Sequence, residues 1–253
     1  MIEICALASG SNGNCYYIGN SNDAVLVDAG ISTKQIMLRM QQRQLSSEKI
    51  RALFITHEHT DHIRGARVLC KKLGIPAYLT TGTYLSIREQ ERPGRVQLFT
   101  AGETIEAGHF LMHSFPKNHD AAEPCSFRVE YRQTSVGVFT DIGEPCEKVQ
   151  SNLKLCRAVF IESNYDEQML WNGPYPYPLK QRIASRVGHL SNDQSFGLVR
   201  SYGGEQLEYV ILSHLSKENN TPQKAYQNFA ALQERYNVLV SSREEASEVF
   251  VLK

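Results

Sequence analysis

The 253-residue sequence lacks several features that would assign it at once to a broad class of protein. No stretch reaches about 18 consecutive apolar residues, and Met1–Cys5 is not a cationic segment leading into a long apolar run. Neither a membrane span nor a signal peptide is therefore expected. The 27 basic and 27 acidic residues cancel, so the chain has no overall basic field, and a nucleic-acid substrate would need a local basic patch.

Cysteine is also sparse. The six cysteines form no CxxC pair. In a chain of this size without a secretory signal, we expect reduced and mostly buried thiols and a cytoplasmic location. The chain is 42% hydrophobic, which is enough for one large core, and it has no internal repeat and no low-complexity linker. The Pro-rich stretch Gly173–Pro178 is too short for a linker and is interpreted as a rigid loop. We expect a single domain over residues 1–253.

Short apolar runs that alternate with helical patterns predict an α/β fold. Strands are expected at Met1–Ser9, Cys15–Gly19, Ala24–Asp28, Ala52–Thr56, Ala77–Thr80, Val96–Phe99, His109–Phe115, Phe127–Tyr131, Ser135–Thr140, Ala158–Glu162, Tyr209–Ser213 and Asn237–Val240. Helices are expected at Thr33–Gln44, Ile63–Leu73, Ser191–Tyr202 and Pro222–Tyr236.

The most informative segment is His57–His62 (HEHTDH), which puts three imidazoles and the carboxylate of Asp61 within six residues. Imidazole suits zinc, iron, cobalt and manganese, and carboxylate suits the harder of these ions. In an extended loop, His57 and His59 can converge on one ion while Asp61 and His62 turn toward a second. A solvated polar loop is the alternative. Because the segment follows the apolar strand Ala52–Thr56, we predict a metal site at the carboxyl end of a strand.

Three later positions can complete such a site. His119 follows a predicted strand, and Asp141 and His214 each directly follow one. A lone polar residue at a strand end is more often a surface or capping residue than a ligand. Their order after His57–His62 favours the metal interpretation for all three.

That order resembles the ligand series of the metallo-β-lactamase fold superfamily, whose fold is an αββα sandwich. Asp28 in Val25–Gly30 (VLVDAG) is similar to the first motif of the superfamily, where a carboxylate supports the ligand loop without binding metal. The alternative for Asp28 is an ordinary turn residue before a glycine.

Further motifs resemble the VicX/YycJ/WalJ group of that superfamily. They are Ala8–Asn14 (ASGSNGN), Glu162–Asn164 (ESN), Gly188–Asn192 (GHLSN) and Ser213–Asn220 (SHLSKENN), and together they cover nearly the whole chain. The group is bacterial and cytoplasmic, and it is associated with manganese-supported 5′-to-3′ exonuclease activity on double-stranded DNA. One departure is Tyr165, which stands where the group is expected to have histidine.

The resemblance implies two divalent metal ions, manganese or zinc, with iron as a further candidate. One ion would be held by His57, His59, His119 and Asp141, and the other by Asp61, His62, Asp141 and His214, so that Asp141 bridges them. Such ions stand about 3.5–4 Å apart and activate water as a nucleophile on phosphorus.

His189 is the candidate general acid or phosphate-orienting residue, because Glu162 and His189 resemble an acid–histidine pair of related tRNA 3′-processing nucleases. Asp61 is counted with them as catalytic. The alternative is that His189 only caps the helix that starts at Ser191. The remaining candidates, for substrate contact, are Ser11, Asn14, Asn164, Lys180, Arg182 and Asn192.

The Gly-rich segment Ser9–Asn14 could offer N–H groups to a phosphate or be a tight turn. Arg182 and Arg186 have helical spacing and could form one basic face for phosphate, or a solvated charged face. His109 and His113 match no motif and are interpreted as structural.

The predicted function is therefore a two-metal phosphodiesterase acting as a DNA exonuclease. Fold does not fix substrate, so an RNA-processing nuclease and a small-molecule hydrolase stay open. A metal-stabilised regulatory protein of a two-component signalling pathway is the non-enzymatic alternative.

Overall fold

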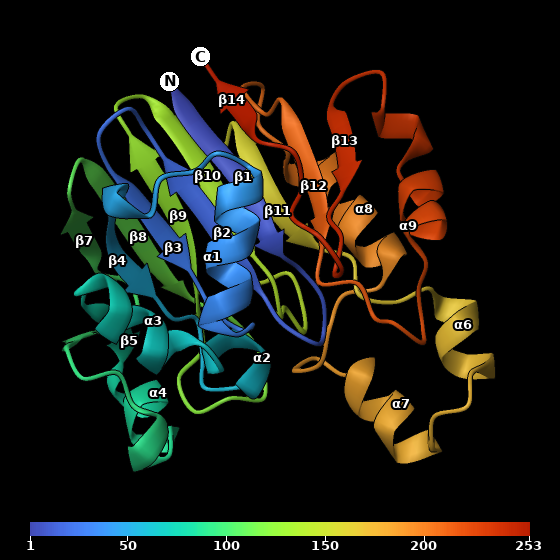
Figure 1. The fold of residues 1–253 in the computed structure, drawn as a ribbon. Coiled ribbons are helices and arrows are strands. Elements are labelled where there is room, and N and C mark those ends of the chain that lie inside the picture. The colour runs from blue at the N-terminus through green and yellow to red at the C-terminus, as the bar shows by residue number, and fades with distance from the viewer.

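Two mixed β-sheets pack face to face in the computed structural model, which describes residues 1–253 (Figure 1). The first sheet has the strand order β14 (Phe250–Leu252), β1 (Ile2–Ala8), β2 (Cys15–Gly19), β3 (Ala24–Val27), β4 (Ile50–Phe54), β5 (Ala77–Thr80) and β6 (Val96–Phe99). The second has the order β13 (Asn237–Val240), β12 (Tyr209–Ser213), β11 (Ala158–Glu162), β10 (Thr134–Phe139), β9 (Cys125–Tyr131), β8 (Phe110–Pro116) and β7 (Thr104–Ala107).

Helices cover the outer faces of both sheets. Helices α1 and α3 pack on the first sheet, and α5, α8 and α9 pack on the second (Figure 1). The helices are α1 (Thr33–Gln42), α2 (Thr60–Ile63), α3 (Ala66–Leu73), α4 (Thr81–Ser86), α5 (Glu147–Leu153), α6 (Glu167–Asn172), α7 (Tyr177–Ile183), α8 (Asn192–Tyr202) and α9 (Pro222–Asn228). This is the predicted αββα sandwich. None of these helices combines the length and the hydropathy that crossing a bilayer requires.

The central core lies between the two sheets. Strands such as β1 are apolar on both faces, because one face packs against the second sheet and the other against helices. Cys5 and Leu7 of β1 point toward α1 and α3, while Ile4 points toward the second sheet. Phe54 and Phe127 meet across the sheets with ring centroids 5.4 Å apart. Complete burial of such a ring contributes about 1.5–3 kcal/mol, so this layer fixes the sheets relative to each other.

The strand directions bring the site residues to one end of the sandwich. Strands β3, β4, β5 and β6 run parallel, as do β10, β11, β12 and β13. The carboxyl ends of parallel strands meet at the same edge of a sheet. The loops that follow β3, β4, β10, β11 and β12 therefore gather side chains from both sheets at this edge.

The prediction of one continuous helix over Ile63–Leu73 is wrong, because the structure has two shorter helices and the first begins earlier. Helix α2 already begins at Thr60, with His59 as its N-cap, so Asp61 and His62 lie on a helical turn and not in an extended loop. Gly65 then separates α2 from α3. Its N–H donates to Ala29 O at 2.7 Å, and a Cβ here would lie 2.3 Å from a neighbouring backbone oxygen. Close packing against another loop therefore interrupts the helix.

Gly173–Pro178, predicted as a rigid loop, is only partly one. Pro176 is the N-cap of α7, and Tyr177 and Pro178 form its first turn, where proline is tolerated because the first N–H groups of a helix have no partner. Strands β7 and β14 and helices α4 to α7 were not predicted. They are short, and β7, at an edge, alternates between exposed and covered residues without a strong apolar run.

Candidate metal centre and active site

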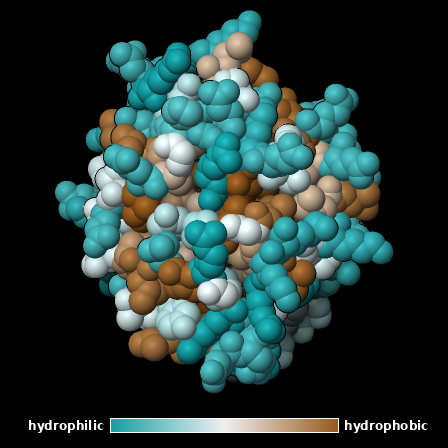
Figure 2. Space-filling view, turned by 60° about the vertical axis from the view of Figure 1, so that its left-hand side comes forward, coloured by the Kyte–Doolittle hydropathy of each residue, from teal (hydrophilic) through white to brown (hydrophobic).

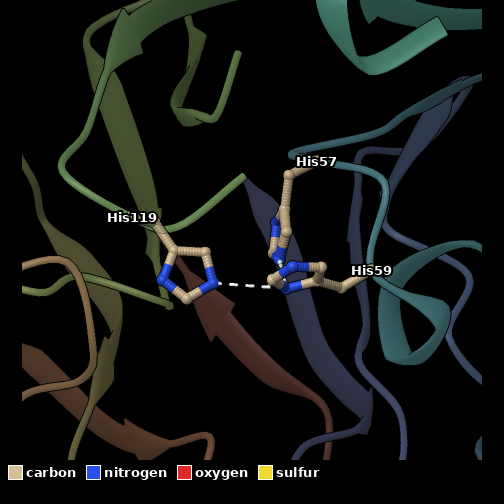
Figure 3. Close-up of side chains that lie close together, drawn as sticks. All are labelled: His57, His59 and His119. Carbon is tan, nitrogen blue, oxygen red and sulfur yellow. Dashed lines mark hydrogen bonds between the residues drawn. The ribbon is translucent and has the colours of Figure 1, made fainter. Parts of the chain in front are cut away.

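Three histidines converge on one point from two loops (Figure 3). His57 Nε2 and His59 Nδ1 lie 3.0 Å apart, and His119 Nε2 lies 3.4 Å from the same His59 nitrogen. Two nitrogens that bind one zinc ion at tetrahedral angles stand about 3.3 Å apart, since each Zn–N bond is about 2.0–2.1 Å. The spacing therefore fits three ligands of one metal ion.

A second set of donors lies beside the first. Asp61, His62 and His214 bring ligand atoms within 4.8 Å of one another, and so do His57, His62 and Asp141. His62 and His214 are buried, with their rings stacked at 5.8 Å. The structure thus brings together all seven residues predicted as metal ligands.

Asp141 lies between the two sets. Its Oδ2 is 3.2 Å from His62 Nε2 and 3.3 Å from His214 Nδ1, while its Oδ1 is 3.8 Å from His119 Nε2. Asp141 Oδ2 and His214 Nδ1 are buried and have no hydrogen-bond partner. Leaving buried polar atoms unpaired is costly, so these two are suited to a cation. The donor set fits a divalent metal.

Asp28 orients His62 from behind. Its Oδ2 lies 2.7 Å from His62 Nδ1, so that nitrogen carries the proton and Nε2 faces Asp141. The same carboxylate accepts hydrogen bonds from the Thr56 N–H at 2.8 Å and from the Thr56 hydroxyl. Asp28 is fully buried and does more than end a turn, because it contacts both Thr56 and His62.

The other histidines are oriented in the same way. Thr56 Oγ1, whose only proton is donated to Asp28, lies 2.9 Å from His57 Nδ1 and accepts from it. His119 Nδ1 donates to Gly188 O at 3.1 Å. Burial lowers the pKa of His57 well below its usual range and that of His119 to about 2. Both rings are therefore neutral, as metal binding requires.

His62 has the opposite electrostatics. Burial alone would lower its pKa, but Asp141, Asp28 and Asp61 around it raise the pKa well above the usual range. Burial would likewise raise the pKa of Asp141, yet His214 and His62 hold it well below its usual range. Three carboxylates around one imidazole make this half of the site a strong attractor for positive charge.

The backbone at the site adopts unusual angles. Asp28, Asp141 and His214 have φ values of 61°, 56° and 57°. These lie in the left-handed region, which residues other than glycine rarely adopt. Such strain persists only where surrounding contacts enforce it, and it concentrates at functional sites. Gly30 shows how tight the support is, because a Cβ there would lie 1.6 Å from Asp61 O.

Glu162 and His189 form the predicted pair. Glu162 Oε1 lies 2.7 Å from His189 Nδ1, and its Oε2 accepts from the N–H groups of Ile142 and Leu190 at 2.7 and 3.1 Å. Burial would lower the pKa of His189, but Glu162 raises it above the usual value. The capping alternative for His189 is wrong, since Ser191 and Gln194 form the capping box of α8 without it.

A cavity of about 260 Å³ opens over these groups. Its floor contains His59, Asp61, His119, Asp141, His189 and His214. One wall comes from the segment that contains α6 and α7, through Tyr175, Leu179, Arg182 and Ile183. Figure 1 shows α6 and α7 at the same end of the sandwich as α2. Of this wall only Arg182 was predicted, and two tyrosines between prolines at 174–178 were the only signal for the rest.

Of the predicted substrate-contact residues, Ser11, Asn164 and Arg182 line this cavity. Asn164 also donates to His214 O at 2.8 Å and so helps to position that histidine. Arg182 forms an ion pair with Asp120.

The other three do not reach the cavity, and these predictions are corrected. Asn14 is buried beneath the ligands, with Nδ2 3.2 Å from His62 Nε2. Lys180 donates to Trp171 O and Gly173 O at 2.8 and 2.7 Å, so its charge stabilises the end of α6. Asn192 bonds the Ser163 hydroxyl at 2.6 Å within the protein.

Two further expectations concern loops and surface charges. Ser9–Asn14 is a tight turn, because Gly13 N–H donates to Gly10 O at 2.9 Å and Gly10 N–H to Asn14 Oδ1 at 3.1 Å. Arg182 and Arg186 do not share a helical face, since α7 ends at Ile183. Arg186 instead pairs with Glu144 at 2.7 Å.

Residues interpreted as structural lie away from the site. His109 bonds Asp23, and His113 Nε2 lies 3.1 Å from Glu130 Oε2. All six cysteines are free, and none belongs to a donor cluster. Tyr165, the departure from the expected motif, is buried and its carbonyl accepts from the Asn192 N–H.

Comparison with known proteins agrees with this geometry. Residues 8–155 match the metallo-beta-lactamase superfamily. The exodeoxyribonuclease WalJ of Streptococcus pneumoniae is 36% identical over 226 residues, which cover 87% of this chain and 84% of that protein. The exodeoxyribonuclease YycJ of Bacillus anthracis is 32% identical over 229 residues, covering 88% and 86%.

A solved structure shows the same fold. The metallo-β-lactamase fold protein YhfI of Bacillus subtilis superposes with a TM-score of 0.74 at 14% identity, covering 97% of this chain and 98% of that one. The family match and the two relatives agree with the geometry of the donors. This chain therefore belongs to the metallo-β-lactamase superfamily and, within it, to the WalJ/YycJ group.

Proposed function

We propose that this chain is a metal-dependent phosphodiesterase that removes nucleotides from double-stranded DNA in the 5′-to-3′ direction. The observation that carries the proposal is Asp141, whose two carboxylate oxygens face two separate groups of donors. The names of the relatives, both exodeoxyribonucleases, support DNA as the substrate. We take residues 1–253 to act as one domain, since both sheets supply donors to the one site.

Two divalent cations would occupy the site. His57, His59 and His119 would hold one, Asp61, His62 and His214 would hold the other, and Asp141 would be shared. The mixture of imidazole and carboxylate suits zinc, manganese or iron. When bound, such ions lower the pKa of water and neutralise charge that develops on phosphoryl oxygens.

The residues of the chain supply orientation and a proton. Glu162 holds the His189 ring by Nδ1, which leaves Nε2 free on the cavity floor. Because Glu162 raises the pKa of His189, this ring keeps its proton to a higher pH than an ordinary histidine does. We assign to His189 the protonation of the leaving oxygen or the orientation of the phosphate, and to Glu162 the positioning of His189.

The cavity walls would select one terminal nucleotide. About 260 Å³ leaves no room for a duplex, so only a chain end can enter deeply. Tyr175 lines the cavity between Pro174 and Pro176, which restrict its backbone. Stacking on such a ring is tolerant of base identity. Ser11, Asn164 and Arg182 add polar contacts.

The test is a linear duplex labelled at its 5′ ends, incubated with protein loaded with Mn²⁺ or Zn²⁺. We expect labelled mononucleotide from the start of the reaction, and its loss in Asp141→Ala and His62→Ala. Asp23→Asn is the matched control, because Asp23 is a buried aspartate that bonds Arg51 and His109 outside the site. Circular dichroism melting of each variant checks folding.

Other outcomes would decide against the proposal. Absence of release with a protein shown to contain metal would exclude the nuclease. Faster cleavage of an equivalent RNA, or of a small thioester, would show that the preferred substrate is not DNA. Release of the 5′ label only at the end of degradation would show that the enzyme digests DNA in the 3′-to-5′ direction.

A further inference from the structure

Five exposed or half-buried cations follow one another along the surface beside α3. They are Arg64, Arg67, Lys71, Arg92 and Arg95, which we call the basic track. None of them forms an ion pair, whereas Arg51, Arg88, Arg182 and Arg186 each pair with a carboxylate. In a chain with zero formal net charge, the track concentrates uncompensated positive charge in one place.

Backbone carbonyls hold four of these side chains in position: Arg64 and three others. Arg67 Nη1 donates to Gln90 O at 2.5 Å, Arg95 Nη1 to Gly74 O at 2.8 Å, and Arg92 Nε to Ile87 O at 3.0 Å. A neutral carbonyl fixes a guanidinium without cancelling its charge, so the remaining N–H groups stay available to an anion.

The track surrounds a hollow in the surface. Arg67, Lys71, Arg92 and Arg95 line a depression of about 540 Å³, in which Glu89 is the one acidic lining residue. A neighbouring depression shares Arg95 and adds Lys72, the acidic Glu48 and Arg51, which is paired with Asp23. Figure 2, which brings the left-hand side of Figure 1 forward, shows mainly hydrophilic groups on this side of the molecule, with apolar residues between them.

The track begins at the rim of the candidate active site. Arg64 Nη1 donates to Asn12 O at 3.3 Å, and Asn12 follows Ser11, which lines the cavity. From there Arg67 and Lys71 continue on one face of α3, whose eight residues span about 12 Å. Phosphates of one DNA strand lie about 3.4 Å apart along the axis, so the track can follow several of them.

We propose that the basic track is the docking surface for the duplex that lies behind the terminal nucleotide, and that its cations bind successive backbone phosphates. The inference rests on the proposed nuclease function and adds where the rest of the substrate lies. The alternative is purely structural: Lys71 in the last turn of α3 complements the helix dipole, and the arginines bond carbonyls.

The test compares two triple variants with the same change of charge. Arg67→Gln/Lys71→Gln/Arg95→Gln removes three cations of the track. Arg200→Gln/Lys148→Gln/Arg235→Gln removes three exposed, unpaired cations from the side of the second sheet. Binding of a fluorescent 30-base-pair duplex in EDTA is followed by anisotropy over a salt series, and hydrolysis of that duplex and of a dinucleotide is measured with metal.

We expect the track variant to bind the duplex about tenfold or more weakly, with a slope of log Kd against log salt reduced by about 0.9 per lost phosphate contact, or about 2.7 in all. Its KM for the duplex rises accordingly, while its dinucleotide hydrolysis is unchanged because only the cavity is used. The control triple variant behaves as wild type.

Equal effects of the two triple variants on duplex binding would overturn the inference and leave the nuclease function intact. A wild-type protein that degrades neither substrate would refute the nuclease instead, and the binding series would still test the track. The single variant Lys71→Gln covers the case in which the triple variant fails to fold, since it should change the slope by about 0.9.

Discussion

Replacement of Asp28 by asparagine should weaken metal binding without a change in any ligand. Asparagine has the same shape as aspartate, but one of its two terminal atoms is an NH2 donor. The Thr56 N–H, which donates to Asp28 at 2.8 Å, excludes that NH2 from the Oδ1 position. The NH2 group must then face His62 Nδ1, which becomes the acceptor, so the proton moves to Nε2.

The magnitude follows from this change of tautomer. An ion can bind Nε2 only if the remaining ring proton sits on Nδ1, and in the variant that N–H would face the NH2 group in place of a carboxylate oxygen. Loss of such a supporting hydrogen bond typically weakens metal affinity about 10–100-fold. Since tenfold corresponds to about 1.4 kcal/mol, the expected loss is about 1.4–2.8 kcal/mol of binding free energy.

Equilibrium dialysis against Mn²⁺ or Zn²⁺ buffers measures that affinity, with elemental analysis of the retained metal. Asp23→Asn is again the control, because it removes a buried, hydrogen-bonded carboxylate that contacts no predicted ligand. Activity of Asp28→Asn should return at higher metal concentration. An unchanged dissociation constant for Asp28→Asn would refute the orientation argument.

Three further perturbations test other parts of the structure. Glu162→Gln should lower kcat about 10–100-fold with little change in KM, because His189 loses its charged partner. Steady-state assays measure both constants, and equal effects on kcat and KM would contradict a positioning role. Gly30→Ala should cost about 3 kcal/mol or more of unfolding free energy in urea titrations, since its Cβ would lie 1.6 Å from a backbone oxygen, whereas Gly197→Ala, which meets nothing within 4 Å, should be neutral or stabilising. For Asp23, burial alone would raise the pKa, but hydrogen bonds from Arg51 and His109 lower it. Its contribution to stability is therefore present above about pH 4 and lost as the pH falls through the lowered pKa, so the wild type should lose more stability than Asp23→Asn between about pH 5 and 3 in thermal melts.

The candidate metal ligands could be identified in the sequence because their signals are local and dense. His57–His62 is recognisable in isolation, and Asp141 and His214 directly follow apolar strands. Strands β2, β5, β6, β11, β12 and β13 were predicted to the residue, because each is a short apolar run between polar segments. The Glu162–His189 contact, across 27 positions, came from the resemblance and not from any local pattern.

Other features depend on tertiary contacts that no local pattern encodes. Lys180 resembles a phosphate ligand in sequence, yet its side chain turns inward to two carbonyls. Asn14 lies in a Gly-rich turn typical of phosphate loops, but its amide supports His62. The basic track could not be predicted from the sequence, because its charges are balanced by acidic residues elsewhere in the chain. Only the fold separates these cations from the acidic residues.

The left-handed backbone at Asp28, Asp141 and His214 has a consequence for how relatives of this protein would diverge. Each of these residues holds angles that glycine adopts without penalty, at a cost of about 1–2 kcal/mol. Asp141 Oδ2 and His214 Nδ1 have no hydrogen-bond partner, so selection for stability alone would favour glycine at these two positions, and their present identity reflects selection for chemistry. A descendant that no longer performs the reaction should accumulate glycine at 141 and 214 and unfold at a higher temperature.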